Sequence, residues 1–376
     1  MKILLTGGGS GGHFYPIIAV VDAIYEIVQG KRLIIPELIL AADSKYDNEL
    51  IEKEGLKFKK IYAGKIRRYP SFLNFIDLFK SALGVLKAIW LIYSEMPDVV
   101  FGKGGYASFP PLLAARFFGI PVMIHESDTV PGKVNRWAGK FAKKIAISFP
   151  ETAEYFPKEK TALVGNPIRK SLNGSSMEEG RELFNLEIGL PTLLVLGGSQ
   201  GSQKINDTIL DIAGELVKFY QIIHQCGKSN EEDAGARLNT IMEASLFRNR
   251  YHLFPYLNES QLRAASKITD LVIARAGAST IFEIANWGIP SILIPLENSA
   301  QDHQRENAYS YARNNAGIVL EENNLTPNVL ASEIKKLLSE EKKLGAMKEA
   351  AKEFAKPDAA RKIAEEILNL ALEHAK

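Results

Sequence analysis

The first residues that could do chemistry lie near the start of the chain, where the glycine-rich stretch 7–12 is followed at once by His13. A run of glycines after a short apolar strand lets a phosphate or sugar lie against bare backbone. The helix that follows supplies unpaired N–H groups and the positive end of its dipole. An imidazole with an ordinary pKa of about 6.5 can accept a proton at neutral pH. The stretch therefore predicts an anion-binding loop with a proton acceptor beside it.

The spacing of Gly7, Gly9 and Gly12 also fits a dinucleotide-binding loop. Such a site needs an acidic residue about 20 residues further on, at the end of the second strand. Here the next predicted strand ends later, at Asp43. A dinucleotide loop has no use for His13, but a histidine can also simply cap or pack against a helix start. Both alternatives stay open at this point.

A second set of candidate residues follows the predicted strand 271–274. The turn at Gly277 should open a helix whose first N–H groups, with the hydroxyls of Ser279 and Thr280, can hold a diphosphate. Glu283 lies one turn further along and could accept two hydrogen bonds from a ribose diol. The alternative is an ordinary first-turn glutamate that the helix dipole favours.

Polar residues that could bind a sugar follow the predicted strand 291–294. Asp302 and Gln304 lie where a polar loop enters a helix, and both can hydrogen-bond to sugar hydroxyls. Asp302 could instead be only the N-cap of that helix.

Short apolar strands alternate with longer amphipathic segments along the whole chain. In the first half the predicted strands are 2–6, 38–42, 58–61, 99–101, 121–124, 144–147 and 161–164. In the second half they are 192–196, 219–224, 252–254, 271–274, 291–294 and 317–320. This alternation predicts an α/β fold with doubly wound parallel sheets, in which ligands gather at the carboxyl ends of the strands. A chain of 376 residues exceeds the roughly 250–300 at which single cores stop growing, so we expect two domains.

Four further loops stand at predicted strand ends. They are 102–110 (GKGGYASFP), 125–128 (HESD), 165–169 (GNPIR) and 197–202 (GGSQGS). The last repeats the strand, glycine loop and helix of the N-terminus, which indicates two similar domains. The stretch 172–179 is polar and predicts the linker between them.

Composition narrows the class of protein. The formal charge of +2 argues neither for nor against nucleic acid as a bulk partner, and we expect no nucleic acid partner. Cys226 is the only cysteine, which excludes an internal disulfide and suits a reducing cytoplasm. The predicted strand at the N-terminus leaves no room for a signal peptide, so we expect no export.

The most apolar segment, 69–93, has two possible roles. Polar residues at helical spacing and the charges of Lys80 and Lys87 favour an amphipathic helix over a membrane span. It could be a core helix, or it could dock on an anionic bilayer, because basic residues surround it. These are Lys65, Arg67, Arg68, Lys133, Arg136, Lys140, Lys143 and Lys144. The predicted membrane patch comprises Phe72, Phe75, Leu78, Phe79, Lys80, Lys87 and Lys140.

Seven motifs taken together identify a family. They are GGGSGGH, GKGGYASFP, HESD, GNPIR, LGGSQGSQKIN, RAGASTIFE and DHQRENA. In this order and rough spacing the chain resembles the MurG family of bacterial GT-B glycosyltransferases. That family adds N-acetylglucosamine (GlcNAc) to lipid I, the undecaprenyl-pyrophosphoryl-MurNAc-peptide, to give lipid II for peptidoglycan. The resemblance covers essentially the whole chain.

The resemblance implies a GT-B fold, two Rossmann-like domains facing across a cleft. Residues 1–168 would hold lipid I and dock on the cytoplasmic face of the cell membrane as a peripheral protein. Residues 169–355 would hold UDP-GlcNAc, and the final segment 356–376 would form a helix that packs back on the first domain. No cofactor and no bound metal are implied.

The resemblance also assigns residues. Donor binding would fall to Ser10, Gly11, Gly12, Asp128, Arg169, Ser199, Leu257, Ala278, Ser279, Thr280, Ile281, Phe282, Glu283 and Gln304. Of these, Leu257 would meet uracil through its backbone, Glu283 the ribose and Gln304 the GlcNAc hydroxyls. The acceptor phosphates would lie on Gly9, Gly104, Gly105 and Tyr106.

Transfer of this kind converts an α-linked donor into a β-linked product, so the MurNAc 4-hydroxyl must lose a proton as it attacks. We expect His13 to be the general base, with Glu126 and Asp128 in reserve. Helix N-terminal amides and Arg169 would stabilise the leaving diphosphate. One departure matters, because the family usually has HEQN where this chain has HESD, which puts an acid at Asp128 in place of an amide.

Three alternatives remain at this stage. A nucleotide-dependent oxidoreductase would explain the first glycine loop, but it would not explain the function of the motifs GGSQG and DHQRENA. A non-catalytic sugar-nucleotide-binding protein would keep Glu283 and Gln304. A related GT-B transferase would use another sugar nucleotide or another lipid acceptor.

Overall fold

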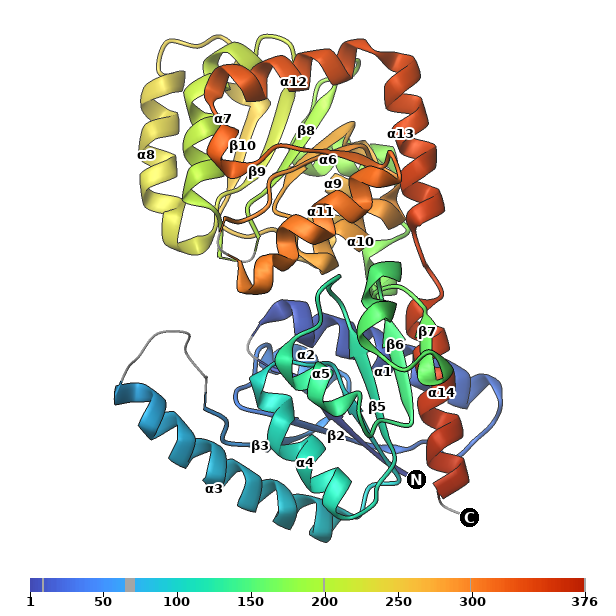
Figure 1. Ribbon diagram of the computed structural model, residues 1–376. Helices are drawn as coiled ribbons and strands as arrows, with labels where there is room; N and C mark the ends of the chain where they lie inside the picture. Colours follow the sequence, from blue (N-terminus) through green and yellow to red (C-terminus); the bar gives the residue numbers. More distant parts are fainter. Residues whose placement is uncertain (9, 65–71, 199, 298, 375–376) are drawn as a thin grey trace. The chain divides into compact units, whose positions relative to one another are not determined.

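The computed structural model describes residues 1–8, 10–64, 72–198, 200–297 and 299–374, without the side chains of 72–79 and 300. The chain divides into two compact units (Figure 1). The first unit comprises Met1–Arg169 together with Lys356–Lys376, and the second comprises Lys170–Ala355. The second unit is therefore inserted into the first along the sequence.

The first unit is built on a parallel sheet. Its described strands are β1 (Lys2–Thr6), β2 (Glu37–Ala42), β3 (Lys57–Lys60), β4 (Val99–Gly102), β5 (Val122–Glu126), β6 (Lys144–Ile147) and β7 (Thr161–Leu163). They pair in the order β3-β2-β1-β4-β5-β6-β7, and every pair is parallel. The order reverses between β1 and β4, which is where doubly wound sheets bind their ligands.

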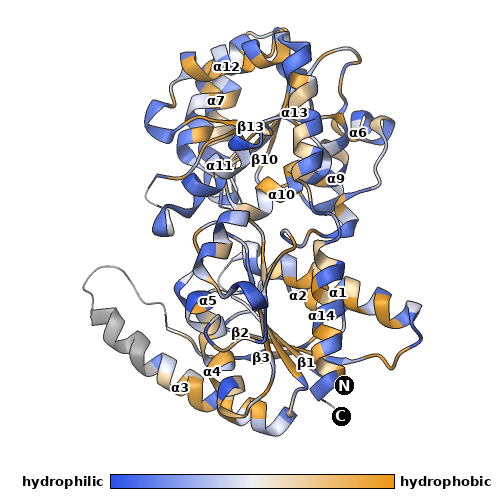
Figure 2. Ribbon diagram, turned by 45° about the vertical axis from the view of Figure 1, so that its right-hand side comes forward, coloured by the Kyte–Doolittle hydropathy of each residue, from blue (hydrophilic) through white to orange (hydrophobic). Residues whose placement is uncertain are grey.

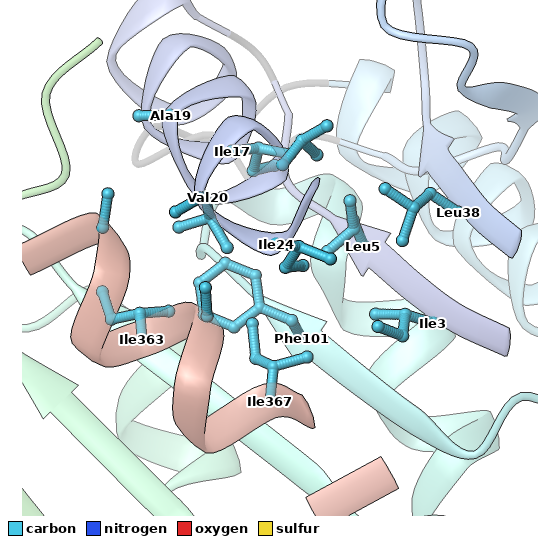
Figure 3. Close-up of a cluster of buried hydrophobic side chains, with 14 of the residues drawn as sticks. Ile3, Leu5, Ile17, Ala19, Val20, Ile24, Leu38, Phe101, Ile363 and Ile367 are labelled. Atoms are coloured by element: carbon cyan, nitrogen blue, oxygen red, sulfur yellow. The ribbon is translucent and has the colours of Figure 1, made fainter. Parts of the chain in front are cut away.

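Helices cover both faces of this sheet. They are α1 (Gly11–Gly30), α2 (Asn48–Lys53), α3 (Phe72–Glu95), α4 (Phe109–Phe117), α5 (Lys133–Ala138) and α14 (Ala359–His374), with 3-10 helices η1 (Tyr106–Ser108), η2 (Pro150–Tyr155) and η3 (Lys158–Lys160). On one face, Ile363 and Ile367 of α14 pack beside Val20 and Ile24 of α1 over Phe101 of β4 (Figure 3). On the other face α3, α4 and α5 form a second apolar cluster with the strands.

The second unit repeats this plan with a smaller parallel sheet. Its described strands are β8 (Thr192–Leu196), β9 (Gln221–Gln225), β10 (Tyr251–Phe254), β11 (Leu271–Ala274), β12 (Ser291–Leu293) and β13 (Gly317–Val319). They pair in the order β10-β9-β8-β11-β12-β13. The order reverses between β8 and β11, so the second glycine loop also follows a strand at a reversal point.

Two apolar clusters, one on each face of the sheet, hold the second unit together. The helices are α6 (Met177–Phe184), α7 (Gln203–Leu216), α8 (Glu231–Met242), α9 (Glu259–Ile268), α10 (Ala278–Trp287), α11 (His303–Arg313), α12 (Pro327–Ser339) and α13 (Glu341–Phe354). The 3-10 helices are η4 (Lys170–Leu172), η5 (Lys228–Asn230), η6 (Arg248–Arg250), η7 (Ala300–Asp302) and η8 (Glu322–Asn324). Figure 2 shows β1 in the hydrophobic colour and α11 largely in the hydrophilic colour, as expected for a buried strand and a surface helix.

The predicted fold class is confirmed, and each predicted strand is present with its ends shifted by at most a few residues. Helix α3 begins within the predicted amphipathic segment 69–93 and ends at Glu95, but its sides are not arranged as polarity would suggest. Gly84 and Ala88 pack inward, and the carbonyl of Tyr62 comes so close that a Cβ on Gly84 would be 1.7 Å from its oxygen. The backbone of α3 therefore approaches its neighbour closely at Gly84, and the buried side continues with Ala88, Leu91 and Ile92.

Candidate active site

The glycine loop of the first unit leads from β1 into α1, and His13 lies in the first turn of that helix. The His13 imidazole lies over the turn made by Gly104 and Gly105. A Cβ placed on Gly105 would be 3.2 Å from His13 Cδ2 and 3.3 Å from Nε2. The same Cβ would be 2.6 Å from the Gly8 carbonyl oxygen, and Gly105 has a φ of 82°, so only glycine fits there. The structure therefore brings together His13 and the second predicted loop.

Tyr106 continues that second loop, and its hydroxyl donates a hydrogen bond to Asp43 at the end of β2. Asp43 occupies the place at which a dinucleotide site would need a free acid for the ribose. The other carboxylate oxygen lies against Gly8, where an added Cβ would be 2.9 Å from Oδ1. A dinucleotide ribose would have to displace the Tyr106 hydroxyl from Asp43. This geometry counts against the oxidoreductase alternative.

Glu126 ends β5 and holds the loop that follows. Its Oε1 accepts the Asp128 backbone N–H at 3.1 Å, and its Oε2 accepts the Gly132 N–H at 3.0 Å and Asn135 Nδ2 at 2.9 Å. Burial and the charge of Asp128 raise the pKa of the Glu126 carboxyl. Both oxygens of Glu126 are thus occupied by N–H donors that fix the backbone. This arrangement suits a positioning residue better than the reserve base that the sequence suggested.

Lys103 is a site residue that the motif contained but that we did not single out from sequence. It follows β4, is 1% exposed, and its ammonium donates a hydrogen bond to Ser127 Oγ. Burial lowers the pKa of the Lys103 ammonium to about 8, although the charges of Glu126 and Asp128 oppose that shift. A lysine between a strand and two glycines was the only available signal.

His125 precedes Glu126 and is fully buried. Its Nε2 lies 2.9 Å from the carbonyl oxygen of Gly165, which can only accept, so Nε2 carries the proton. Burial lowers the pKa of His125 well below its ordinary value, and the charge of Lys103 lowers it further. His125 is therefore a neutral link between β5 and the loop after β7.

The loop after β7 completes the site of the first unit. Asn166 is buried, and its Oδ1 accepts a hydrogen bond from Ser127 Oγ at 3.3 Å. Arg169 is 8% exposed, and its guanidinium stacks 4.0 Å from the ring centroid of Tyr15, two residues beyond His13. The loops after β1, β4, β5 and β7 therefore meet at one edge of the sheet. They place a candidate base, a buried ammonium, a guanidinium and two carboxylates there.

The glycine loop of the second unit is fixed by its neighbours. A Cβ on Gly201, which has a φ of 78°, would be 2.0 Å from the Cys226 carbonyl oxygen, so only glycine allows this approach. Asn206 Nδ2 donates to the same carbonyl at 2.9 Å, and Asn206 Oδ1 lies 3.0 Å from His224 Nε2. His224 Nδ1 lies 2.7 Å from the Tyr251 hydroxyl. Neutral buried groups thus support this loop.

The helix predicted to open at Gly277 is α10, with Gly277 as its N-cap in an extended conformation. Ser279, Thr280 and Glu283 are partly exposed, so their side chains are accessible to a ligand. The side chains of the other predicted residues in this segment are buried, and these could offer only backbone groups; they are Ala278, Ile281 and Phe282.

An ion pair just before α10 was not predicted. Arg275 pairs with Glu322, donates to Ser202 Oγ at 2.7 Å and also donates to the carbonyl of Ile294 at 3.3 Å. It therefore ties the ends of β11 and β12 to the start of α7. The signal in the sequence was an arginine in the first position after a predicted strand.

Leu257, the predicted uracil contact, has a buried side chain, and its backbone N–H donates to Gln225 Oε1 at 2.9 Å. Gln225 Nε2 in turn donates to the Gly198 carbonyl at 3.1 Å, so this glutamine links the glycine loop to the predicted uracil segment. Gln304 is partly exposed, and its Oε1 accepts the Leu296 N–H at 3.1 Å. The Gln304 amide nitrogen is chemically able to donate a hydrogen bond to a ligand.

Asp302 occupies the N-cap position of α11, which was the alternative to a sugar-binding role in the sequence analysis. Its backbone does not have the usual extended N-cap conformation. Its φ is 58°, and the preceding Gln301 has a φ of 56°. Two successive non-glycine residues in the left-handed region store conformational strain next to Gln304. The Asp302 carboxylate lies 3.6 Å from Arg305 in an ion pair.

Some predicted residues lie outside the described part of the structure. These are Gly9 and Ser199, the side chains of Phe72, Phe75, Leu78 and Phe79, and the basic residues Lys65, Arg67 and Arg68. Lys80, Lys87 and Lys140 of the predicted patch are exposed. Nearby, large apolar side chains are exposed on α3 and α4: Leu83 58%, Leu86 64%, Trp90 68%, Tyr93 59% and Phe117 73%.

Two other properties bear on the class of site. Among the described residues, no group of three or more His, Cys, Asp or Glu side chains could hold a metal ion. Helix α1 is long and apolar enough to span a bilayer, but 61% of its apolar window is buried, as in a core helix. In the described part of the chain no other helix meets the same criteria.

Family models match both units. The glycosyltransferase family 28 N-terminal domain matches residues 3–147, and the glycosyltransferase family 28 C-terminal domain matches residues 192–363. The two matches cover both glycine loops.

Individual proteins are similar over nearly the whole chain. The UDP-N-acetylglucosamine–N-acetylmuramyl-(pentapeptide) pyrophosphoryl-undecaprenol N-acetylglucosamine transferase of Clostridium kluyveri is 39% identical over 337 residues, which cover 89% of this chain and 91% of that protein. The protein of the same name from Treponema denticola is 35% identical and covers 90% of this chain and 88% of its own length. The crystal structure of Acinetobacter baumannii MurG matches with a TM-score of 0.73 at 25% identity, over 98% of this chain and 99% of that one.

Proposed function

This chain belongs to the family of UDP-N-acetylglucosamine–N-acetylmuramyl-(pentapeptide) pyrophosphoryl-undecaprenol N-acetylglucosamine transferases, and we propose on this premise that it transfers GlcNAc from UDP-GlcNAc to lipid I, giving lipid II. The family inferred from the seven motifs is thus confirmed. The observation that carries the proposal is the similarity over about 90% of the chain, which includes both glycine loops. The reaction is inverting, and the attacking group is the 4-hydroxyl of MurNAc.

In this proposal the first unit holds the acceptor, and His13 is the general base. The support is the position of the imidazole, which lies over Gly105 at the edge where the acceptor loops meet. There it could accept the proton of a hydroxyl whose diphosphate lies on the glycine turns. Glu126 holds the loop to Gly132, and Arg169 adds a positive charge near the start of α1.

The second unit holds the donor in this proposal. The first N–H groups of α10 and the hydroxyls of Ser279 and Thr280 bind the diphosphate. The helix dipole stabilises the negative charge that develops on this diphosphate as UDP leaves. Glu283 accepts hydrogen bonds from the ribose. Because the N–H of Leu257 is already donated to Gln225, a uracil contact here would use the Leu257 carbonyl oxygen.

We also propose that α3 and α4 dock the first unit on an anionic bilayer. The support is the exposed aromatic and aliphatic surface formed by Leu83, Leu86, Trp90, Tyr93 and Phe117, where α3 and α4 lie side by side (Figure 1). Exposed apolar side chains bordered by lysine and arginine are typical of membrane-surface helices. A core role for the same face does not explain this exposure.

The membrane proposal can be tested with Leu86→Glu combined with Trp90→Glu. Burial of each apolar side chain contributes about 1.5–3 kcal/mol, so we expect at least about 10-fold weaker binding to phosphatidylglycerol vesicles. Leu246→Glu, at a 91% exposed position in the second unit, is the matched control and should bind as before. Unchanged vesicle binding of the double variant at an unchanged melting temperature would contradict docking through this face.

The transfer itself is tested by UDP release from UDP-GlcNAc with and without a short-chain lipid I analogue, with UDP-glucose as a competing donor. Release only when both UDP-GlcNAc and the acceptor are present is the expected result. Release with UDP-glucose instead would assign another sugar nucleotide. Binding of UDP-GlcNAc without any release would favour a non-catalytic binding protein.

A further inference from the structure

The loop after β12 carries Gln304, the residue that we expect to meet the GlcNAc hydroxyls. The described parts of this loop are 295–297 and 299–304. Gln304 Oε1 accepts the Leu296 N–H at 3.1 Å, and the Gln304 backbone N–H donates to Ser299 Oγ at 3.3 Å. The orientation of the Gln304 amide therefore depends on where the start of the loop is held.

The start of the loop is held from the neighbouring strand. β12 and β13 are parallel partners, so the residues that follow the two strands meet at the carboxyl edge of the sheet. There the Glu297 N–H donates to Glu322 Oε2 at 2.9 Å, and Glu297 Oε1 accepts a hydrogen bond from Asn323 Nδ2 at 3.0 Å. Both partners of Glu297 belong to η8. A backbone and a side-chain hydrogen bond thus attach the loop to η8.

Glu321, which directly precedes η8, holds the chain beyond the loop. Its Oε1 accepts a hydrogen bond from Arg305 Nε at 2.9 Å and another from the Tyr309 hydroxyl at 2.7 Å. Both donors lie on α11, shortly after Gln304. The three consecutive residues 321–323 therefore contact the chain on both sides of Gln304.

Glu322 is the most buried of these three residues, and it also connects the loop to the second glycine loop. Its side chain is 14% exposed and forms an ion pair with Arg275, which is 12% exposed. Arg275 donates to the carbonyl of Pro295 at 3.3 Å and to Oγ of Ser202, the N-cap of α7, at 2.7 Å. Both carboxylate oxygens of Glu322 are accepting, Oε1 from Arg275 and Oε2 from the Glu297 N–H. A ligand would have to break one of these bonds, so the contacts favour a role through neighbours.

We propose that Glu322 is a positioning residue that, with Glu321 and Asn323, forms a clasp holding Gln304 in the orientation that binds the sugar of the donor. Affinity for the sugar then depends on residues 321–323, whereas the diphosphate and ribose contacts of α10 do not need them. The inference rests on the proposed transferase function for its ligand, a nucleoside diphosphate sugar. Its structural consequence, an ordered loop after β12, is independent of that function.

The first test compares binding of UDP-GlcNAc and of UDP, by calorimetry on the full-length protein and on Glu322→Ala. The change removes the hydrogen bond to the Glu297 N–H and frees the loop, so we expect UDP-GlcNAc to bind about 10-fold more weakly. The dissociation constant for UDP should stay within about twofold. Equal weakening for both ligands, or unchanged binding of UDP-GlcNAc, would overturn the proposal. Glu349→Ala, at an exposed glutamate paired with Lys352, is the control and should bind both ligands as before.

A double-mutant cycle with Gln304→Ala shows whether Glu322 acts through Gln304. In the Gln304→Ala background, Glu322→Ala should weaken UDP-GlcNAc binding by only about twofold or less. A loss as large as in the unmodified background would mean that Glu322 affects the ligand by another route, and would overturn the proposal.

Hydrogen–deuterium exchange separates this inference from the proposed function. If the unmodified protein binds neither UDP nor UDP-GlcNAc, the donor function fails, and the clasp is read from exchange without ligand. Glu322→Ala should then speed exchange in peptides that contain Leu296 and Gln304 by about 10-fold, without changing exchange in α8. Unchanged exchange near Gln304 would overturn the clasp. If Glu322→Ala does not fold, Glu322→Gln replaces it in the same measurements, with an expected loss of about threefold for UDP-GlcNAc alone.

Discussion

The two glycine loops of the molecule follow the same strand position in two similar sheets, yet they rest on different chemistry. The loop of the first unit lies against Lys103, whose ammonium is hydrogen-bonded to Ser127 and is acted on by the charges of Glu126 and Asp128. The loop of the second unit rests on the Cys226 carbonyl and on Asn206. The topology is shared, and the difference comes from what is buried beneath each loop.

The second unit also keeps its buried polar groups neutral or evenly paired. Burial lowers the pKa of His224 to about 3 and raises the pKa of Tyr251 well above its ordinary value, so both stay uncharged near neutral pH. In the same unit the guanidinium of Arg275 forms an ion pair with the carboxylate of Glu322. We infer that the first unit is built for proton transfer and the second for holding a ligand in a fixed place.

The strongest test of this division is His13→Ala. Loss of a general base should lower turnover by about 100-fold or more, while the dissociation constant for UDP-GlcNAc stays within about twofold. Turnover with a lipid I analogue and calorimetric donor binding measure the two quantities. His374→Ala, at the exposed end of α14, is the control. Unchanged turnover would remove His13 from the mechanism and with it the contrast between the units.

The converse test is Glu283→Ala in the second unit. Hydrogen bonds to a charged group contribute about 1.5–3 kcal/mol, so we expect UDP-GlcNAc binding to weaken about 10- to 100-fold. Turnover at saturating donor should change far less, because the residue does not take part in proton transfer. Glu341→Ala on the exposed start of α13 serves as the matched control. A large fall in turnover with unchanged donor binding would assign Glu283 to the chemistry instead.

A smaller effect is expected from Asn206→Ala, which tests the neutral support. The change leaves the Cys226 carbonyl and His224 Nε2 without the Asn206 amide, at a cost of about 1–3 kcal/mol in the free energy of unfolding. Chemical denaturation measures this loss. Asn239→Ala on exposed α8 should cost much less. If Asn206→Ala left stability unchanged but abolished donor binding, the network would belong to the binding site and would not be mere support.

The sequence predicted more of the fold than of the site. Alternation of apolar strands and helices placed each strand, and Gly277 marked the start of α10, because both signals are local. The roles of Lys103 and Glu126 were missed because they depend on which groups from distant loops meet at a sheet edge. For α3 the sequence left two roles open, a core helix and a membrane-docking helix, and it did not show which side chains would be exposed. Periodicity identifies a helix, but at Gly84 close backbone packing decides which side turns inward.

The return of α14 to the first unit has a consequence for how the protein is made. Ile363 and Ile367 fill the core beside α1 and β4, although the whole second unit is translated before them (Figure 3). During synthesis, the apolar side of α1 has no covering helix until the last residues leave the ribosome. The unit whose translation begins first therefore completes its folding last, and a chain that stops after Ala355 would expose an apolar stripe that chaperones and proteases recognise.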